Sequence, residues 1–319
     1  MSLKPIFDYL RKKLLGKISF YQGEINNDAV NASKNLIPGE VLLFENIRFF
    51  KEEENDDENF AKNLSKLGDF YINEAFSCSH RKQASLHKIT KYIDSYGGPL
   101  LEKEIQSINL ILKNKKEPVT SIIGGSKVST KINVLLNLIQ NVNNLIIVGA
   151  MANNFLKYNS INVSNSLIEE GTESMIEMIY DSAKSTNCKI HLPSDVMLDS
   201  NENKLIDELP TSYDFKILDI SVSSHTVLEK LIGNSDIVLW NGPMGMIEDN
   251  KFSKGSVNLA HLLAKSQADV VIGGGDTILA INMAEEKFEN FYFVSTAGGA
   301  FLEALEDKDL PGIEALMAD

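Results

Sequence analysis

With 319 residues, the chain is long enough to form two domains that each bury a core. Its 43% hydrophobic and 24% charged residues are typical of a globular protein, and its net charge of −13 argues against nucleic-acid or anionic-membrane partners. The sequence has no apolar run near the about 20 residues of a membrane span, no signal-peptide pattern and two distant cysteines. We therefore expect a cytoplasmic protein with reduced thiols.

The first hundred residues alternate short β-branched or aromatic runs with helical and loop segments. Three of these runs are expected to be strands: 17–21, 40–46 and 69–76. An acidic cluster, KEEENDDEN at 51–59, is interpreted as a solvated loop or the start of a helix. After the break at Gly97-Gly98-Pro99, residues 100–114 favour a helix.

The rest of the chain repeats a pattern of strand and then helix. The expected strands are 120–123, 144–148, 189–192, 236–240, 269–272 and 291–295. Strands that alternate with helices form parallel sheets covered on both faces. We therefore predict an α/β fold of two Rossmann-like parallel-sheet domains joined by the 100–114 helix, with the N-terminal domain incomplete. Trp240, the only tryptophan, is expected in the core at a strand end.

Glycine-rich turns follow several expected strands of the second half. They are Gly124-Gly125-Ser126-Lys127, Asn241-Gly242-Pro243-Met244-Gly245, Gly273-Gly274-Gly275-Asp276-Thr277 and Thr296-Ala297-Gly298-Gly299. In an open parallel sheet, ligands bind beyond the carboxyl ends of the strands, where glycines and helix N-termini present backbone amides to an anion. One such turn is often a mere connection, but this set favours a phosphate or nucleotide site. GGSKVS is not a Walker sequence and GGGDTI lacks the third glycine of the dinucleotide fingerprint, so both common patterns are disfavoured.

Two lysines and an aspartate in these turns have alternative interpretations. If a helix begins near Ser126, Lys127 and Lys131 share one face and could clamp two phosphate groups; otherwise they are exposed surface lysines. Asp276 could cap its helix together with Thr277, or it could contact Mg²⁺, which favours one or two carboxylates plus phosphate oxygens. Taken alone, the capping interpretation of Asp276 is the stronger.

Arginine is scarce in this chain, since only Arg11, Arg48 and Arg81 are found among 31 basic residues. The planar guanidinium binds carboxylates and phosphates through two parallel hydrogen bonds. Arg48 and Arg81 are therefore candidates for anion binding, although incidental surface charges remain the alternative. His80 has no paired nucleophile and no metal-ligand spacing, so we interpret it as structural or adjacent to a substrate.

Six segments together resemble the phosphoglycerate kinase family, in that family's order and over essentially the whole chain. They are LLFENIRFFKEEE (42–54), DFYINEAFSCSHRKQAS (69–85), IIGGSKVSTKI (122–132), VLWNGPMGMIE (238–248), VIGGGDT (271–277) and VSTAGGAFLEALE (294–306). The resemblance implies a glycolytic and gluconeogenic kinase that transfers a phosphoryl group reversibly between 1,3-bisphosphoglycerate and MgADP, giving 3-phosphoglycerate and ATP. It also implies a cytoplasmic monomer with Mg²⁺ as the cofactor and no nucleic-acid or membrane partner.

The resemblance further implies roles for individual residues. Those assigned to catalysis are Lys127, Lys131, Gly298 and Gly299. Those that would grip phosphoglycerate are Arg48 and Arg81. Those that would bind nucleotide are Gly125, Ser126, Lys131, Asn241, Glu248, Gly275, Asp276 and Thr277. In this assignment the lysines face phosphates, Glu248 faces the ribose, and Asp276 is the Mg²⁺ contact.

The same resemblance predicts how the chain divides. The expected parts are a partial phosphoglycerate-binding domain (1–99), an interdomain helix and hinge (100–118), a nucleotide-binding domain (119–300) and a C-terminal segment (301–319) that returns toward the first domain. In the family the two substrates sit on facing domains, which a hinge motion closes.

The sequence also departs from the family pattern. Val148-Gly149-Ala150 replaces a glycine triplet, so side-chain bulk is expected near the adenine pocket. ISVSSHT at 220–226 replaces a Gly-Pro pair, and Ala297 stands in a glycine run. Residues 2–5 resemble a segment that follows about two βα units in the family. At about 30 residues a unit, roughly 60–80 residues with several substrate loops are expected to be absent, which leaves a three-stranded sheet with an exposed edge.

Two hypotheses of different class follow. The first is a phosphoglycerate kinase with an N-terminally short sequence; the second is a catalytically impaired remnant that binds ADP or ATP without phosphoryl transfer. One of the absent loops carries an arginine assigned to transition-state charge, and loss of such an arginine can cost about 10³–10⁵ in rate. We therefore expect little or no activity from the 319-residue chain assayed alone.

Overall fold

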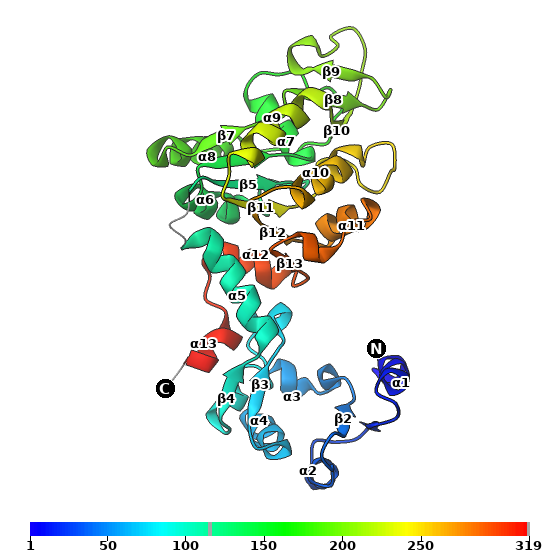
Figure 1. Cartoon of the computed structure of the whole chain (residues 1–319). Coiled ribbons are helices and arrows are strands. Elements are labelled where there is room, and N and C mark those ends of the chain that lie inside the picture. The colour runs from blue at the N-terminus through cyan, green and yellow to red at the C-terminus, as the bar shows by residue number, and fades with distance from the viewer. Residues whose placement is uncertain (114–116, 318–319) are drawn as a thin grey trace. The chain divides into compact units, whose positions relative to one another are not determined.

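The computed structural model describes residues 1–113 and 117–317, which form two compact units (Figure 1). Unit 1 comprises Met1–Glu102 and Asp309–Asp319, and unit 2 comprises Lys103–Lys308. The expected helix end at residue 114, part of the expected hinge and the last two residues of the chain lie outside the described residues. Within the described part, no helix is both long enough and apolar enough to cross a membrane.

Unit 2 contains most of the regular structure. Its strands are β5 (Val119–Ile123), β6 (Asn144–Ile147), β7 (Lys189–His191), β8 (Asp195–Leu198), β9 (Asn203–Leu205), β10 (Ile217–Ile220), β11 (Ile237–Asn241), β12 (Asp269–Gly273) and β13 (Phe293–Ser295). Its helices are α6 (Ile132–Asn141), α7 (Ala150–Tyr158), α8 (Glu173–Thr186), α9 (Val222–Gly233), α10 (Lys254–Ala264), α11 (Gly275–Met283) and α12 (Gly299–Leu305), with short 3₁₀ turns η5 (Ile206–Glu208) and η6 (Phe288–Asn290).

The main sheet of unit 2 has six strands in the order β13-β12-β11-β5-β6-β7, and all neighbouring pairs are parallel. The central strands β5 and β11 are buried along their whole length, as their continuous apolar sequences require. Helices α6, α8 and α12 pack together, and so do α9, α10 and α11. All six strands predicted for the second half of the sequence lie in this sheet, which confirms the α/β prediction.

Trp240 lies at the centre of the unit 2 core. It is fully buried and shares a cluster with Ile122, Ile272 and Leu259, which come from β5, β12 and α10. Its indole Nε1 donates a hydrogen bond of 2.8 Å to the carbonyl oxygen of Gly242. The prediction that Trp240 is a core residue at a strand end is confirmed, and its hydrogen bond ties the core to the loop after β11.

A second sheet of unit 2 was missed by the sequence patterns. It is antiparallel, with three strands in the order β10-β8-β9. These strands are three or four residues long, and β9 is largely exposed, so they show neither a β-branched run nor a clear alternation. Val196, Leu198 and Phe215 form the small core beneath them.

Unit 1 consists mainly of short elements. They are α1 (Lys4–Lys13), β1 (Ile18–Tyr21), α2 (Asn27–Lys34), β2 (Val41–Phe44), η1 (Ile47–Phe49), α3 (Lys51–Glu54), α4 (Glu58–Leu64), η2 (Ser65–Leu67), β3 (Tyr71–Asn73), η3 (Phe76–Cys78), η4 (Lys88–Lys91), β4 (Ser95–Gly97) and α13 (Pro311–Met317). Helix α5 (Pro99–Leu112) crosses the division between the units.

The expected three-stranded sheet of the N-terminal part is wrong for the described residues. β1 pairs with β2 and β3 pairs with β4, which gives two parallel sheets of two strands each. The extra strand, β4, was not predicted because its sequence, SYG, is short and ends in glycine. Ile25, Phe60, Leu64 and Ile89 form part of the core of this unit.

Helix α5 begins where the Gly-Gly-Pro break predicts. Pro99 occupies its first turn, and the carboxylate of Glu74 accepts hydrogen bonds from the backbone N–H groups of Leu100 (3.0 Å) and Leu101 (3.1 Å). A side chain at Gly98 would collide with Glu74, because a Cβ atom there would lie 2.2 Å from the Glu74 carboxyl carbon. Glycine at 98 therefore makes this capping carboxylate possible.

Further along α5, Glu104 is a buried acid with an exposed fraction of only 3%. Burial raises the pKa of its carboxyl to about 7, although a hydrogen bond with Ser295 at the end of β13 opposes the shift. Its Oε2 atom has no hydrogen-bond partner among the described residues. Below about pH 7 the folded chain therefore favours the protonated form of Glu104.

We predict that Glu104→Gln flattens the pH dependence of stability. Because the folded pKa is raised from 4.5 to about 7, the contribution of Glu104 to stability is fully present below pH 4.5 and is lost as the pH rises through 7. At pH 8 the variant should exceed the parent chain by about 1–3 kcal/mol in unfolding free energy. Urea unfolding followed by Trp240 fluorescence at pH 5 and pH 8 measures this difference. The exposed Glu173→Gln is the control, and equal pH profiles for parent and Glu104→Gln would contradict the prediction.

Candidate active site

The carboxyl ends of five parallel strands in unit 2 form a single row. In the strand pairing, Ile147, Ile123, Asn241, Gly273 and Ser295 are successive partners across β6, β5, β11, β12 and β13. The loops that leave these strands therefore start side by side at one edge of the sheet. All four glycine-rich turns predicted from the sequence are among these loops, so the structure brings them together.

Asn241 connects three of these loops. Its backbone oxygen accepts a hydrogen bond from Gly124 N (2.8 Å), and its Nδ2 donates to the oxygen of Gly273 (2.7 Å). Its Oδ1 accepts from Nζ of Lys131 (2.7 Å), which also donates to the oxygen of Gly124 (2.6 Å). Asn241 is almost fully buried, so this amide is a structural centre of the site rather than an exposed contact.

Thr277 completes the network from helix α11. Its hydroxyl accepts a hydrogen bond from Gly242 N (2.7 Å) and donates one to the oxygen of Gly273 (2.9 Å). The side chain is fully buried. Thr277 therefore joins the first turn of α11 to the loop after β11.

The loops after β5 and β11 approach each other too closely for side chains. A Cβ atom on Gly242 would lie 2.4 Å from the oxygen of Gly124, and one on Gly124 would lie 2.2 Å from the oxygen of Pro243. Gly242 also has a φ angle of +95°, which L-residues rarely adopt. Glycine is required at both positions.

Lys131 is held in a low-dielectric environment. Burial lowers the pKa of its ammonium group to about 8, and the negative charge of Asp276 partly opposes this shift. Its two hydrogen bonds leave one of the three N–H donors without a partner among the described residues. An anion bound beside Lys131 would take that donor and raise the pKa again.

The expected helical clamp of Lys127 and Lys131 is wrong. Helix α6 begins at Ile132, so both lysines lie in the preceding loop and do not share a helix face. Lys127 is exposed, and Ser129 beside it donates its hydroxyl and its N–H to the carboxylate of Glu169. These hydrogen bonds, together with the charge of Lys127, hold the pKa of Glu169 below its ordinary value. The loop, rather than a helix, places the two ammonium groups.

The capping interpretation of Asp276 is also wrong. Helix α11 begins at Gly275, and its N-cap residue is Gly274, with a φ angle of +102° and no side-chain cap. Asp276 lies in the first turn of the helix, with its side chain exposed beside the main cavity of unit 2. Its carboxylate is therefore free for a role other than capping.

That cavity has a volume of about 340 Å³ and opens beside the row of strand ends. Four predicted nucleotide residues line it: Gly125, Ser126, Glu248 and Asp276. Lys131, Asn241 and Thr277 lie in the network described above instead. The other walls include apolar groups from α7, the loop after α7, β10 and the loop after β11: Leu156, Leu167, Ile217, Met244 and Met246. Glycine motifs do not reveal these apolar walls, because Leu and Met carry no distinctive pattern.

Asp219 in the cavity wall was not anticipated. It is 2% exposed, and its carboxylate accepts hydrogen bonds from the backbone N–H groups of Ile220 (2.9 Å) and Gly255 (2.8 Å). Burial raises the pKa of Asp219 to about 7 despite these bonds. A Cβ atom on Gly245 or Gly255 would lie within 2.4 Å of its Oδ1, so both glycines make room for it. The only sequence signal was the unusual segment 220–226 that follows directly.

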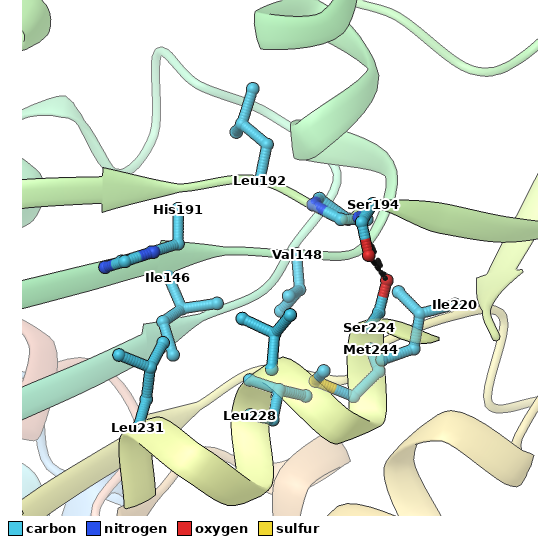
Figure 2. Close-up of a pocket in the computed structure, with 12 residues that line it drawn as sticks. Ile146, Val148, His191, Leu192, Ser194, Ile220, Ser224, Leu228, Leu231 and Met244 are labelled. Carbon is cyan, nitrogen blue, oxygen red and sulfur yellow. Dashed lines mark hydrogen bonds between the residues drawn. The ribbon is translucent and has the colours of Figure 1, made fainter. Parts of the chain in front are cut away.

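Val148 does not line the main cavity itself. Figure 2 shows its side chain in a separate small pocket with Ile146, Ile220 and Met244. Of the altered triplet, Gly149 and Ala150 line the main cavity. The valine is thus accommodated in apolar packing beside α9.

Gly298 and Gly299 lie at the start of α12, after β13. Gly298 is the N-cap residue, with a φ angle of +57°. A Cβ atom at either glycine would meet no atom within 4 Å, so the space beside this turn is open. The turn is therefore less crowded than the Gly124–Gly242 contact.

The two candidate arginines belong to unit 1, where Cys78 links them. Nη2 of Arg48 donates to Sγ of Cys78 (3.1 Å), and the backbone N–H of Arg81 donates to the oxygen of Cys78 (3.0 Å). Nε of Arg81 donates to Nε2 of His80 (3.2 Å). Both arginines are exposed. The bond to Cys78 Sγ involves the guanidinium of Arg48, whereas the bond to the Cys78 oxygen involves only the backbone of Arg81. His80 thus accepts a hydrogen bond from one of the two candidate arginines.

A metal ion would have few protein ligands here. Among the described residues, no group of three or more His, Cys, Asp or Glu side chains is arranged to hold one. Asp276 offers a single exposed carboxylate beside the cavity. This arrangement fits Mg²⁺ that arrives with phosphate oxygens and uses one or two carboxylates.

The comparisons with known proteins point to one family. The phosphoglycerate kinase (PGK) family model matches residues 1–308. The phosphoglycerate kinase of Wolbachia pipientis wMel is 37% identical, with 99% of this chain and 81% of the relative aligned. That of a Nitratiruptor species is 42% identical over 99% of this chain and 81% of the relative.

Solved structures give the same result. The phosphoglycerate kinase structure from Coxiella burnetii matches with a TM-score of 0.89 at 34% identity, and 99% of this chain and 81% of that chain are covered. The one from Pyrococcus horikoshii OT3 has a TM-score of 0.84 at 25% identity, with 99% and 82% covered.

We predict that Thr277→Val destabilises unit 2, because it removes the hydrogen bond that joins α11 to the loop after β11. The change leaves the N–H of Gly242 without its acceptor in a buried place, which should cost about 1–3 kcal/mol. Urea unfolding followed by Trp240 fluorescence measures the loss, with Thr211→Val, an exposed threonine, as the control. Equal midpoints for Thr277→Val and the parent chain would show that the hydroxyl contributes nothing.

Proposed function

The chain belongs to the phosphoglycerate kinase family, and from that premise we propose that unit 2 binds MgADP or MgATP at the row of strand ends while unit 1 binds 3-phosphoglycerate or 1,3-bisphosphoglycerate. Members of the family transfer a phosphoryl group between these substrates without a covalent enzyme intermediate. The observation that carries the proposal is the convergence of the predicted glycine turns at one edge of the sheet, where residues of three of them, including Asp276, line one cavity of about 340 Å³ and Lys131 bonds to Gly124.

The cavity suits a nucleotide with its base among apolar side chains and its phosphates toward the sheet. Glu248 lines the cavity and is proposed to contact the ribose. Gly125, Ser126 and Asp276 line the same cavity. The backbone amides of Gly125 and Ser126 are proposed to contact phosphate oxygens, as is Gly275 at the start of α11. Asn241 and Thr277 would act mainly by holding this loop arrangement in place.

Charge compensation is proposed to come from a few groups. Lys131, already held by two carbonyl oxygens, would donate its remaining N–H to a nucleotide phosphate, and exposed Lys127 would face the transferred group. Asp276 would hold Mg²⁺, which in the bound state bridges phosphate oxygens and neutralises developing charge. The amides at Gly298 and Gly299 would add donors to the transferring phosphoryl group.

In unit 1, the exposed guanidinium groups of Arg48 and Arg81 are proposed to bind the carboxylate and phosphate of phosphoglycerate. The Arg48 guanidinium contacts Cys78, which lies three residues before Arg81, and this supports a joint role. The division into a phosphoglycerate domain (1–99), a hinge (100–118), a nucleotide domain (119–300) and a returning C-terminal segment (301–319) is part of the same proposal. A monomeric state and a cytoplasmic location stay predictions of the family resemblance.

We predict that MgADP binding takes up a proton near pH 8 through Lys131. With a pKa of about 8, about half of the free chains carry a neutral Lys131 at that pH, and a bound phosphate raises the pKa. Calorimetry in Tris and in HEPES should therefore give an uptake of about 0.5 proton per site at pH 8 and almost none at pH 6.5. Lys131→Met should lose the uptake, whereas Lys157→Met, an exposed lysine, should keep it. Uptake that survives in Lys131→Met would refute this assignment.

A turnover assay separates the kinase from a chain that only binds nucleotide. We expect little or no 3-phosphoglycerate-dependent ATP consumption by the purified chain, and any turnover that is measured should fall by at least a hundredfold in Arg81→Ala and in Lys131→Met. Each variant removes one cation from the proposed binding of a separate substrate, a loss of about 2.7 kcal/mol or more. MgADP binding without any turnover in the parent chain would favour the alternative hypothesis, a nucleotide-binding chain that does not transfer phosphate.

A further inference from the structure

One glutamate of the acidic cluster at 51–59 is not solvated, which contradicts the interpretation of the whole cluster as a solvated segment. Glu53 is 1% exposed, whereas Glu52 and Glu54 on the same helix, α3, are exposed. A buried carboxylate is costly unless it is paired or hydrogen-bonded. Its position therefore requires a compensating partner.

Ser85 is that partner, and it uses both oxygens of the carboxylate. The backbone N–H of Ser85 donates to Oε2 of Glu53 (2.9 Å), and the hydroxyl of Ser85 donates to Oε1 (2.7 Å). The backbone oxygen of Glu53 accepts a third bond from Ala84 N (3.0 Å). A single residue of α3 thus holds the chain at 84–85 by three hydrogen bonds.

A second contact joins the same two segments. Nδ1 of His87 lies 2.7 Å from Oδ2 of Asp56, and both side chains are mostly buried, at 26% and 14% exposed. Asp56 adopts a φ angle of +51°, a conformation that L-residues seldom adopt unless their surroundings hold them in it. We call these two contacts, Glu53–Ser85 and Asp56–His87, the clasp.

The clasp joins the segment that follows Arg48 to the segment that follows Arg81. Arg48 is carried by η1, immediately before α3, and Arg81 precedes Ser85 by four residues. The turn after Arg81 is itself stiff, since Leu86 N and His87 N both donate to the oxygen of Gln83. Movement at Ser85 would therefore be transmitted to Arg81, and movement of α3 would be transmitted to Arg48.

The charges around Glu53 link it to the arginine site as well. Burial raises the pKa of the Glu53 carboxyl, while the Ser85 hydrogen bonds and the positive charge of Arg48 lower it and Asp56 raises it further. Tyr71 on β3 also faces Glu53, and burial together with this carboxylate raises the pKa of the phenol. Arg48 is the one cation among these groups, so its charge favours the ionised form of the buried carboxyl.

We propose that Glu53 and Ser85 are positioning residues for substrate binding: their hydrogen bonds, supported by Asp56–His87, fix Arg48 and Arg81 relative to each other so that both can grip one phosphoglycerate. This inference rests on the proposed function of the two arginines. Neither Glu53 nor Ser85 needs to touch the substrate. The clasp restricts the motion of the two loops before the substrate binds. Less conformational entropy is therefore lost on binding.

The test compares binding of two ligands to the full chain. Calorimetry with 3-phosphoglycerate should show an affinity at least tenfold weaker in Glu53→Gln and in Ser85→Ala than in the parent chain. MgADP, which is proposed to bind unit 2, should bind within twofold of the parent affinity in both variants. Ser85→Thr keeps the hydroxyl and should restore 3-phosphoglycerate binding, and Glu54→Gln, an exposed neighbour on α3, is the matched control.

Hydrogen exchange supplies a readout that does not depend on ligand. Amides of residues 81–87 should exchange at least tenfold faster in Glu53→Gln and Ser85→Ala, with the amides of unit 2 unchanged. If Glu53→Gln does not fold, Ser85→Ala with its Ser85→Thr partner still carries the comparison.

The outcomes separate failure of the inference from failure of the proposed function. Arg81→Ala is the reference variant. If Arg81→Ala weakens 3-phosphoglycerate binding but Ser85→Ala does not, the clasp inference is overturned while the arginine role stands. If Arg81→Ala has no effect, or the parent chain does not bind 3-phosphoglycerate, the proposed function of the arginines fails and the clasp loses its role with it. Weaker binding in Ser85→Ala that Ser85→Thr does not restore also overturns the inference.

Discussion

The contact between the backbones of Gly124 and Gly242 is the constraint on which the candidate site of unit 2 depends. With no side chain at either position, the loops after β5 and β11 can approach until Gly124 N reaches the oxygen of Asn241. That approach brings the Asn241 amide within reach of Lys131 and of Gly273. Thr277 then closes the network from the next loop. The polar groups are satisfied together, which is why the arrangement can be both buried and rigid.

Buried charge in this chain is compensated by hydrogen bonds more than by ion pairs. Lys131 is held by a carbonyl and an amide oxygen, Asp219 by two backbone N–H groups, and Glu53 by one serine. Neutral partners hold a charged group in place without cancelling its field. Lys131 can therefore attract an anion in a chain whose net charge is −13.

The sequence allowed some features to be predicted because their signal is local. The long β-branched runs predicted all six strands of the main sheet, and the glycine turns predicted the edge where the candidate site lies. The strands β8 to β10 were missed because they are short and partly exposed. Lys131 and Asp276 were assigned to a helix face and to a cap because a helix start shifted by a few residues cannot be read from the sequence. Where α6 and α11 begin depends on loop contacts with β11 and β12, which are distant in the chain.

Glu53 shows the same limit in unit 1. In sequence it is one of several consecutive acids, and nothing in KEEENDDEN distinguishes it from its exposed neighbours. Only the pairing of α3 with the segment at 84–87 buries it. Conversely, the scarcity of arginine singled out Arg48 and Arg81, and the structure gives both a contact with Cys78.

The row of paired strand ends limits which insertions and deletions the strands of this sheet can accept. Each residue of a strand advances the chain by about 3.3 Å, and successive side chains point to opposite faces. Deleting one residue within β11 would draw Asn241 back by that distance, turn its amide to the other face of the sheet and separate it from Lys131 and Gly273.

A slide of the whole strand could not absorb such a deletion, because the chain is also fixed just before β11. There Asp236 N donates to the oxygen of Pro118 (2.9 Å), and the oxygen of Asp236 accepts a hydrogen bond from Asp269 N (2.8 Å). With both ends held, the number of residues in β11 is itself a fixed quantity. Insertions and deletions that preserve the fold should therefore fall in the loops beyond these contacts. The length of β11 sets the distance between the contacts at its two ends.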